Sequence, residues 1–213
     1  MRAGWALVGL ALACGGVQAQ QVAVDPPDAG GDAPAAWSFL ATGFWNMPRQ
    51  EGNYGSGIFA ADRGALHLEA RINYEALDAR SGFIGWSFSG GEKIQYKVTP
   101  IVGFVAGSAH GPIAGVEASL AVGKFDYYIE AEYLPGTGST TPYTYAWSEL
   151  GFRPVQWLRL GLVAQRTRIY GGDREFQRGG MLQLTYGKVT GSVYWFNPKS
   201  QEQVVIAAVT VAF

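Results

Sequence analysis

Cysteine, charge and long apolar runs are all scarce in this sequence, and each scarcity excludes a class of protein. The only cysteine is Cys14, so no disulfide framework supports the fold. Charged residues make up 15% of the chain, well below the roughly 25% that is usual in soluble domains. The net charge of −1 and the lack of a basic stripe argue against nucleic-acid binding. Beyond the N-terminus, no apolar stretch approaches the roughly 20 residues of a membrane-spanning helix.

The first 19 residues have the three parts of a secretory signal peptide. Arg2 supplies the positive charge, Trp5–Ala13 is the apolar run, and Val17-Gln18-Ala19 places small residues at the cleavage position. Cleavage at that point removes Cys14 with the peptide. The alternative is a lipoprotein signal with Cys14 as the lipidation site, although the leucine that usually stands three residues before such a cysteine is missing. Both interpretations predict an exported chain.

Residues 20–35 have no periodic pattern. They contain three prolines and three aspartates, at Pro26, Pro27, Pro34, Asp25, Asp28 and Asp32. This composition predicts a flexible periplasmic linker. From Trp37 onward apolar and polar residues alternate, so residues 36–213 are predicted to form a single β domain.

An alternation with a period of two marks the strands of this domain. In the clearest example, Leu66, Leu68, Ala70, Ile72 and Tyr74 alternate with His67, Glu69, Arg71, Asn73 and Glu75. Similar alternation runs through residues 93–104, 125–133 and 158–167. A helix would spread these charges around its whole circumference, whereas a strand places them on one face.

The segment Tyr143–Phe152 can be read in either phase. We place Glu149 on the polar face, because a carboxylate that faces hydrocarbon costs more free energy than a hydroxyl. This choice predicts that Tyr145 and Trp147 also point to the polar face.

Short and longer connections alternate along the chain. Gly123-Lys124 and Gly187-Lys188 are two-residue hairpin signals with glycine at the first central position, as a type II′ turn requires. Further tight connections are predicted at Asp62-Arg63-Gly64, Gly90-Gly91 and Arg153-Pro154. Six longer polar segments lie between them, at 46–53, 77–81, 107–111, 135–141, 169–175 and 197–202. Five turns and six loops join twelve strands, as periplasmic turns and extracellular loops do in a membrane barrel.

The last strand favours such a barrel over a soluble sheet. Its apolar face carries Val205, Val209, Val211 and Phe213. A strand this apolar would aggregate in water unless both edges were paired and this face met lipid. A terminal phenylalanine of this kind resembles the last strand of bacterial outer-membrane β-barrels, where it is a recognition signal for the assembly machinery.

This resemblance names no specific family within the superfamily of Gram-negative bacterial outer-membrane β-barrels. It implies an all-β fold, namely a transmembrane antiparallel up-and-down β-barrel of about 12 strands in the outer membrane. The partners it implies are outer-membrane lipid, lipopolysaccharide and the β-barrel assembly machinery, which would recognise Phe213.

The alternation of side chains along the strands predicts which polar residues point into the lumen. Its acids are Glu69, Glu75, Glu117, Asp126, Glu130, Glu132 and Glu149, its bases are Arg71, Lys93, Lys97 and Arg159, and His67 points the same way. Seven acids against four bases predict an acidic interior. An acidic interior suits a narrow passive channel for small solutes that favours cations. If the charges instead cross-link one another, they make a closed structural barrel.

One pair of acids gives a sharper prediction. The Gly123-Lys124 turn sets Glu117 directly opposite Glu130 in the lumen. Like charges that face each other across two strands are destabilising, so a base must compensate them. Lys97 has the right phase on the preceding strand and is the predicted compensating base. The alternative is that the two acids form a cation or proton site.

An outer-membrane lipid-modifying or hydrolytic enzyme that uses His67 or His110 is the alternative function. No nucleophile motif flanks Ser108 or Ser56, however, and no catalytic residue is assigned. Two distant histidines without a cysteine make a zinc site unexpected, and the glycines form no phosphate-binding pattern, so no cofactor is expected. A soluble exported β-sandwich that binds a ligand is the second alternative.

Arg166 and Arg168 lie toward the outer end of a predicted strand, after the lipid-facing Leu162 and Ala164. Guanidinium groups bind phosphate through two hydrogen bonds, so contact with lipopolysaccharide is predicted. The alternative is that both side chains simply extend to the water interface. Either interpretation places them at the membrane boundary.

Overall fold

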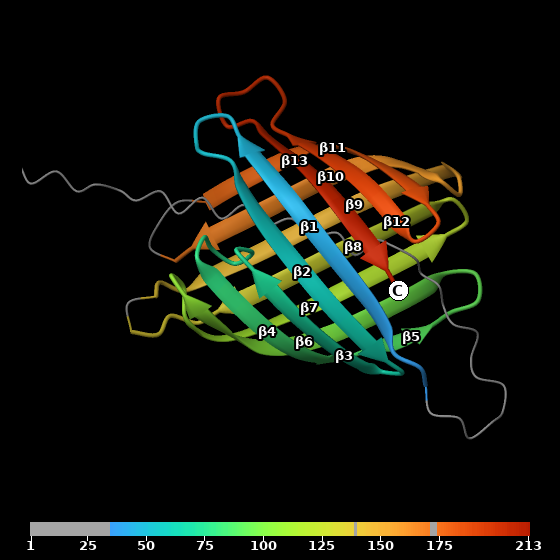
Figure 1. Ribbon diagram of the computed structural model, residues 1–213, viewed down its shortest axis with the longest axis horizontal. Helices are drawn as coiled ribbons and strands as arrows, with labels where there is room; N and C mark the ends of the chain where they lie inside the picture. The colour runs from blue at the N-terminus through green and yellow to red at the C-terminus, as the bar shows by residue number, and fades with distance from the viewer. Residues whose placement is uncertain (1–34, 139, 171–173) are drawn as a thin grey trace, which may run out of the picture.

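The computed structural model describes residues 35–138, 140–170 and 174–213. The signal peptide predicted at 1–19, and all but the last residue of the linker predicted at 20–35, lie outside these residues. The described residues hold thirteen strand segments (Figure 1). They contain no helix that is long and apolar enough to cross a membrane. The segments are β1 (Ser38–Pro48), β2 (Tyr54–Arg63), β3 (Leu66–Ile72), β4 (Ala79–Trp86), β5 (Phe88–Gly90), β6 (Gln95–Gly107), β7 (Gly111–Val122), β8 (Phe125–Leu134), β9 (Tyr143–Val155), β10 (Leu158–Ile169), β11 (Arg174–Tyr186), β12 (Val189–Phe196) and β13 (Val204–Ala212).

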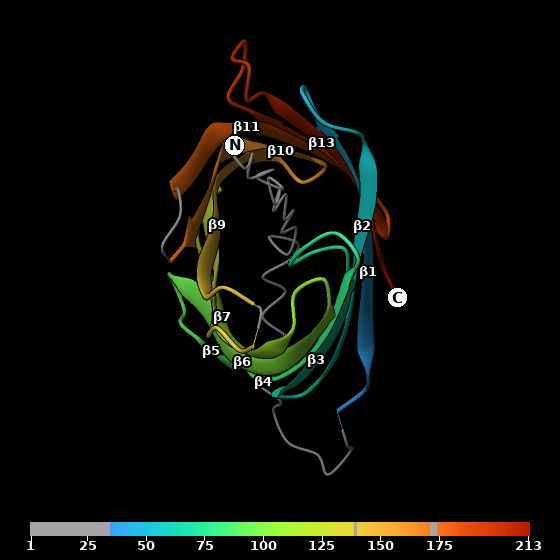
Figure 2. The same cartoon turned by 90° about the vertical axis from the view of Figure 1, so that its left-hand side faces the viewer.

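The sheet closes on itself as an antiparallel barrel, which Figure 2 shows as a ring of strands. Except for β4 and β5, strands that follow each other in the chain pair with each other, and β1 pairs with β13 to close the ring. The segments β4 and β5 both pair with β6, in the same register, and only Ser87 separates them. They therefore count as one interrupted strand, and the closed barrel has twelve strands. A closed ring excludes the two-sheet sandwich that was the second alternative.

The seam between the first and last strands is closed by backbone hydrogen bonds. Phe39 N donates to Phe213 O at 2.8 Å, and Phe213 N donates to Phe39 O at 3.0 Å. The two aromatic rings stack with their centroids 5.6 Å apart. Pairing both edges in this way removes the exposed strand edge that would otherwise recruit other chains.

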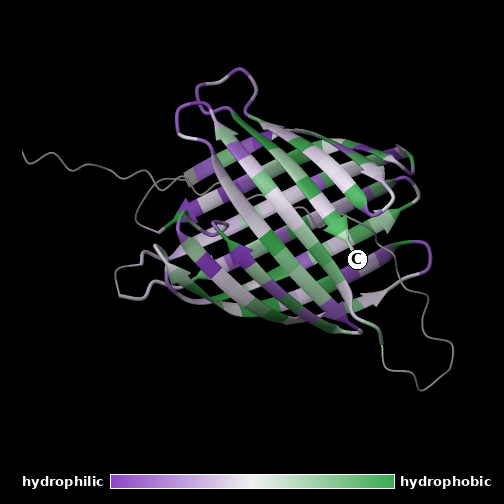
Figure 3. Ribbon diagram, viewed as in Figure 1, coloured by the Kyte–Doolittle hydropathy of each residue, from purple (hydrophilic) through white to green (hydrophobic). Residues whose placement is uncertain are grey.

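Alternating side chains line the two faces of the wall, which Figure 3 shows as bands of hydrophilic and hydrophobic residues along each strand. On the outer face, Val102 is 58% exposed and Leu162 is 64% exposed. On the inner face, Tyr145, Trp147 and Glu149 are all buried. The prediction that Glu149 in the segment Tyr143–Phe152 lies on the polar face is therefore confirmed.

Tight turns join the strands at one end of the barrel, which we call the short-turn end. Gly64, Gly123 and Gly187 have φ values of 60°, 57° and 58°, so glycine supplies the positive φ that the first position of each two-residue turn requires. The turn predicted at Arg153-Pro154 is wrong, because β9 continues to Val155.

The strand continues because Arg153 has partners there. Its Nε donates to Asp126 Oδ2 at 3.1 Å, and its backbone N donates to Lys124 O at 2.8 Å. The register then shifts between Leu158 and Leu160, where β9 and β10 meet after the turn. The turn therefore lies at Gln156-Trp157, three residues later than predicted.

The connection between β3 and β4 turns into the barrel from the opposite, long-loop end (Figure 2). The alternation predicted that Tyr74 faces lipid, but it is fully buried, as are Glu75 and Ala76. The strand ends at Ile72 because Asn73 adopts a positive φ of 51°, and Asn73 Oδ1 accepts a hydrogen bond from Asp78 N at 3.0 Å. That reversal places the aromatic ring and the carboxylate inside the lumen.

Candidate functional site in the barrel lumen

Arg71 is the centre of the largest polar cluster in the lumen. It lies on β3 with a side chain that has no exposed surface. Its Nη1 is 2.6 Å from Glu132 Oε1 and 2.9 Å from Glu130 Oε1, and its Nε donates to Glu69 Oε1. Two further carboxylates stand at longer range, Glu75 at 3.7 Å and Glu117 at 3.6 Å. One guanidinium therefore faces five carboxylates.

Aromatic rings hold the guanidinium in this position. The Arg71 Cζ atom lies 4.5 Å from the ring centroid of Tyr74 and 4.4 Å from that of Phe83, which is the range of cation–π attraction. The Tyr74 hydroxyl also donates to Glu130 Oε2 at 3.0 Å, and the Tyr128 hydroxyl donates to the same oxygen at 3.3 Å. The inward turn after β3 thus completes the cluster by bringing Tyr74 onto it.

The structure confirms that Glu117 lies directly opposite Glu130 on β7 and β8. The compensating base predicted for them, Lys97, is wrong. In the register of β6 and β7, Lys97 faces Ser119, and its Nζ lies 3.6 Å from Asp62 Oδ1 with 43% of the side chain exposed. Arg71 compensates the pair instead, and it reaches them from β3, which is not a neighbour of β7 or β8 in the sheet.

The cluster carries more negative than positive charge. Carboxylates confined at these distances repel one another, and burial makes the repulsion stronger than in water. One arginine cannot neutralise five of them, so the cluster must hold protons or cations besides Arg71. This requirement makes the Arg71 cluster the candidate functional site.

A second cluster lies around Arg159 on β10 and is balanced in charge. Arg159 Nε donates to Asp126 Oδ1 at 2.8 Å, and its Nη1 donates to Glu149 Oε2 at 2.5 Å. Arg153 also pairs with Asp126 at 3.1 Å, and Trp147 Nε1 donates to Glu149 Oε1 at 3.0 Å. Two arginines and two acids form a cross-link between β8, β9 and β10.

Aromatic contacts that include Tyr74 and Trp147 also cross the lumen. Trp147 on β9 contacts Tyr194 and Phe196 on β12, with both pairs of ring centroids 5.2 Å apart. Tyr74 contacts Tyr145 edge to face at 6.5 Å. These contacts join strands that are not neighbours in the sheet, so side chains occupy part of the interior.

His67 on β3 lies toward the short-turn end of the same lumen. Its Nδ1 is 2.8 Å from Asp62 Oδ1, and its Nε2 is 3.5 Å from Glu69 Oε2. Glu69 therefore lies between His67 and Arg71. Sequence alternation placed His67, Glu69 and Arg71 on one face, and the structure shows them in contact.

The other predicted residues lie in three different places. Lys93 is exposed in the turn between β5 and β6, so its assignment to the lumen is wrong: the strand begins only at Gln95. Arg166 is exposed on the outer face, and Arg168 packs over the Tyr170 ring with its Cζ 4.9 Å from the centroid. Their contact with lipopolysaccharide stays a prediction, as does recognition of Phe213 by the assembly machinery.

The loop histidine has a structural partner. His110 Nδ1 lies 3.0 Å from Thr140 Oγ1, and the Thr137 hydroxyl donates to His110 O at 2.9 Å. The Ser108 hydroxyl donates to Leu77 O instead of approaching the imidazole. These bonds tie three loops of the long-loop end together and do not assemble the serine–histidine pair that a hydrolase would need.

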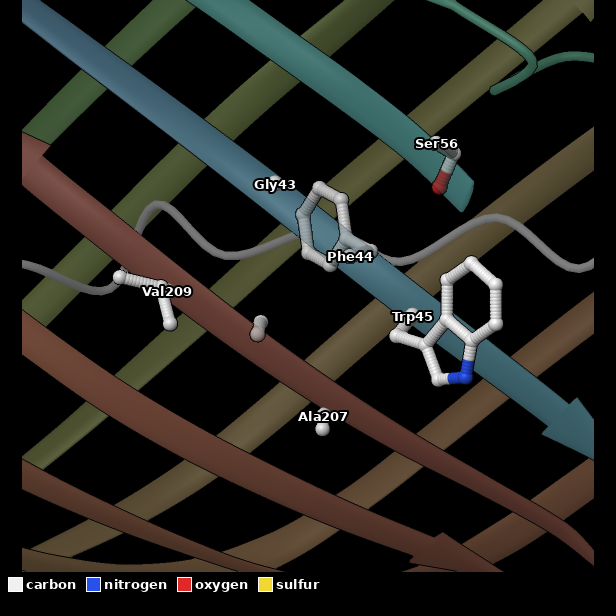
Figure 4. Close-up of a pocket in the computed structure, with 7 residues that line it drawn as sticks. Gly43, Phe44, Trp45, Ser56, Ala207 and Val209 are labelled. Atoms are coloured by element: carbon white, nitrogen blue, oxygen red, sulfur yellow. The ribbon is translucent and has the colours of Figure 1, made fainter. Parts of the chain in front are cut away.

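A shallow depression on the wall spans β13, β1 and β2 (Figure 4). Trp45, Gly43, Ala207 and Val209 are among the residues that line it, and none of its lining residues is titratable. It therefore offers no acid, base or metal ligand.

No protein-family model matches the sequence, and no curated protein matches it. Among solved structures, the NanC porin has a TM-score of 0.51 and 8% identity over 82% of this chain and 98% of that chain. OccK5 (OpdH) of Pseudomonas aeruginosa has a TM-score of 0.44 and 8% identity over 83% of this chain and 66% of that chain. Identity this low shows the fold alone. The chain therefore shares its fold, a closed antiparallel β-barrel, with the NanC porin.

Proposed function

We propose that this protein is a narrow channel of the bacterial outer membrane that admits small solutes and prefers cations. The observation that carries the proposal is the set of five carboxylates around the single guanidinium of Arg71. Carboxylates that line a pore attract cations and repel anions. The apolar outer face and the closed ring support a position in a membrane.

The narrowness of the channel follows from what already occupies the lumen. The turn after β3 brings Tyr74 and Glu75 inward, and aromatic rings meet across β9 and β12. The remaining inner wall, on β11–β13 and β1, carries neutral polar side chains. These include Thr42, Gln183, Thr190, Ser192 and Thr210. These side chains are buried as well, so a solute passes only if side chains in the lumen move aside.

A closed structural barrel is the second candidate, and a specific observation favours it. The Arg71 side chain has no exposed surface, and ring contacts and carboxylates hold it from several sides. A plug of this kind would block even small ions if it did not move. The two functions differ in whether the purified barrel conducts.

Conductance across a planar lipid bilayer separates them. We expect small conductance steps and, in a salt gradient, a reversal potential of the sign that marks cation preference. Replacing both Glu132 and Glu75 by glutamine should move that reversal potential toward zero, because it removes two ionisable carboxyl groups from the acidic wall. Arg166→Gln, on the outer face, is the matched control and should leave it unchanged.

Two results would contradict the channel. If folded protein inserts and gives no steps, the closed barrel is favoured. If the steps prefer anions, or if the double variant keeps the full cation preference, the carboxylates do not set the selectivity.

A further inference from the structure

One edge of the Arg71 cluster places a histidine beside two of its carboxylates. There His67, Glu69 and Glu117 are all buried, and one ligand atom from each lies within 4.8 Å of the others. Imidazole nitrogen and carboxylate oxygen are ligands of first-row divalent metals. Buried carboxylates by themselves do not make a metal site, so the histidine is the residue that distinguishes this group from a cluster of acids.

His67 is oriented as a metal ligand would be. Its Nδ1 is 2.8 Å from Asp62 Oδ1. A hydrogen bond donated to that carboxylate places a proton on Nδ1, so in the neutral imidazole the lone pair is on Nε2. Nε2 points at Glu69, and the described residues supply it with no hydrogen-bond partner although the residue is only 2% exposed. A metal-binding histidine whose other nitrogen is held by a carboxylate is the common arrangement in proteins.

We propose that His67 Nε2, Glu69 Oε2 and a Glu117 oxygen bind a divalent transition-metal ion, with Zn²⁺ as the best-fitting ion, and that Asp62 positions the histidine. Ligands around tetrahedral zinc stand about 3.4 Å apart, given metal–ligand bonds near 2.1 Å. The Nε2–Oε2 distance of 3.5 Å already meets this spacing. One ligand atom of Glu117 lies within 4.8 Å of those of the other two residues, and the contact of Glu117 with Arg71 at 3.6 Å is too long for a hydrogen bond that would hold it away from the ion.

The charges that face the site favour a dication. Arg71 and Lys97 are the nearby cations, but Lys97 is engaged by Asp62 at 3.6 Å. Arg71 is outnumbered by its five carboxylates, so a charge of +2 reduces the net repulsion. The side chains of Asp62 and Lys97 are 31% and 43% exposed, so an ion can approach from the short-turn end. This proposal does not require the barrel to conduct.

Zinc titration of the full barrel tests the site. Protein without a histidine tag is stripped of metal with a chelator in detergent, and Zn²⁺ is added in a calorimeter. One equivalent should bind. His67→Gln and Glu117→Gln should each weaken zinc binding by about 100-fold. This is the upper end of the loss in affinity that follows when a residue that only positions a ligand is changed. Asp62→Asn should weaken zinc binding by about 10-fold, at the lower end of that range.

His110→Gln is the matched control, because it removes the other histidine without touching the lumen, and it should leave zinc affinity unchanged. X-ray absorption at the zinc edge identifies the atoms bound to the ion. It should show one imidazole nitrogen among oxygen ligands, which would not be seen if His67 had only a structural role. Folding of each variant is checked by heat-modifiable gel mobility. If His67→Gln does not fold, Glu117→Gln still decides the question.

Three results would overturn the proposal. Absence of zinc binding would mean that a proton on Nε2 pairs His67 with Glu69 instead. Equal competition by Ca²⁺ or Mg²⁺ would mean that the carboxylates attract cations without the histidine. Unchanged affinity in folded Glu117→Gln would place the zinc elsewhere.

Discussion

Replacing Arg71 by methionine is expected to destabilise the folded barrel by about 3–5 kcal/mol, the cost of removing one partner from a buried ion pair. Methionine keeps much of the volume between the rings of Tyr74 and Phe83 but supplies no charge. The carboxylates of Glu69, Glu130 and Glu132 then lose their closest cation. The free energy of unfolding, measured by denaturant titration in lipid vesicles, reports the loss.

Lys97→Met is the matched control, because it also removes one lumen-side cation. Lys97 is 43% exposed and makes a single ion pair with Asp62, so its loss should cost at most about 1 kcal/mol. The difference between the two variants should shrink as the pH falls, because protonation relieves the repulsion that Arg71 otherwise offsets. If Lys97→Met were the more damaging substitution, Arg71 would not be the centre of the cluster.

Leu162→Arg is expected to destabilise the barrel by about 2–4 kcal/mol, because it places a charge on the lipid face near the middle of the membrane. Leu162 lies within β10, opposite Leu150 and Gly180 on its two neighbouring strands. Its side chain is 64% exposed, so the cost would come from lipid and not from lost packing in a core. Denaturant unfolding from vesicles again measures it.

Tyr186→Arg provides the comparison. Tyr186 is 90% exposed and lies beside the Gly187-Lys188 turn, where the membrane interface tolerates a charge at about 0–1 kcal/mol. Equal costs at the two positions would mean that Leu162 does not face hydrocarbon, and the membrane-spanning band would have to lie elsewhere on the wall.

The sequence predicts the wall of this barrel well because the wall depends on local alternation. A strand sends side chains to opposite faces with a period of two, and one face must avoid charge. The pattern from Leu66 to Ile72 therefore predicts its own orientation, and the cost of exposing Glu149 to lipid resolves the ambiguous segment around Trp147. Glycine at the first position of a two-residue turn fixes the hairpins in the same local way.

The contents of the lumen depend on which strands face each other across the ring, and alternation does not carry that information. Alternation favours Lys97 for the Glu117–Glu130 pair because Lys97 lies on the neighbouring strand, whereas Arg71 approaches from β3 through the interior. Alternation also predicts that Tyr74 faces lipid, because it does not show that the backbone reverses at Asn73.

The site at His67 shows the same limit. Alternation sets His67 and Glu69 on one face, but it does not show that Glu117 lies close to them. Glu117 comes near His67 only because the sheet closes and brings part of β7 close to β3 inside the barrel. The signal available in the sequence was Asp62, which the turn at Gly64 places directly opposite His67.

The placement of the barrel across the outer membrane underlies both the channel and the lipid-facing predictions. A chain whose only cysteine is Cys14 suits single-cysteine labelling. Intact cells that carry Glu51→Cys or Gln201→Cys in the long loops, or Lys124→Cys or Lys188→Cys in the short turns, are treated with a membrane-impermeant maleimide. The account predicts that the two loop cysteines react on intact cells and that the two turn cysteines react only after the outer membrane is opened. Labelling of Lys124→Cys or Lys188→Cys on intact cells would contradict it.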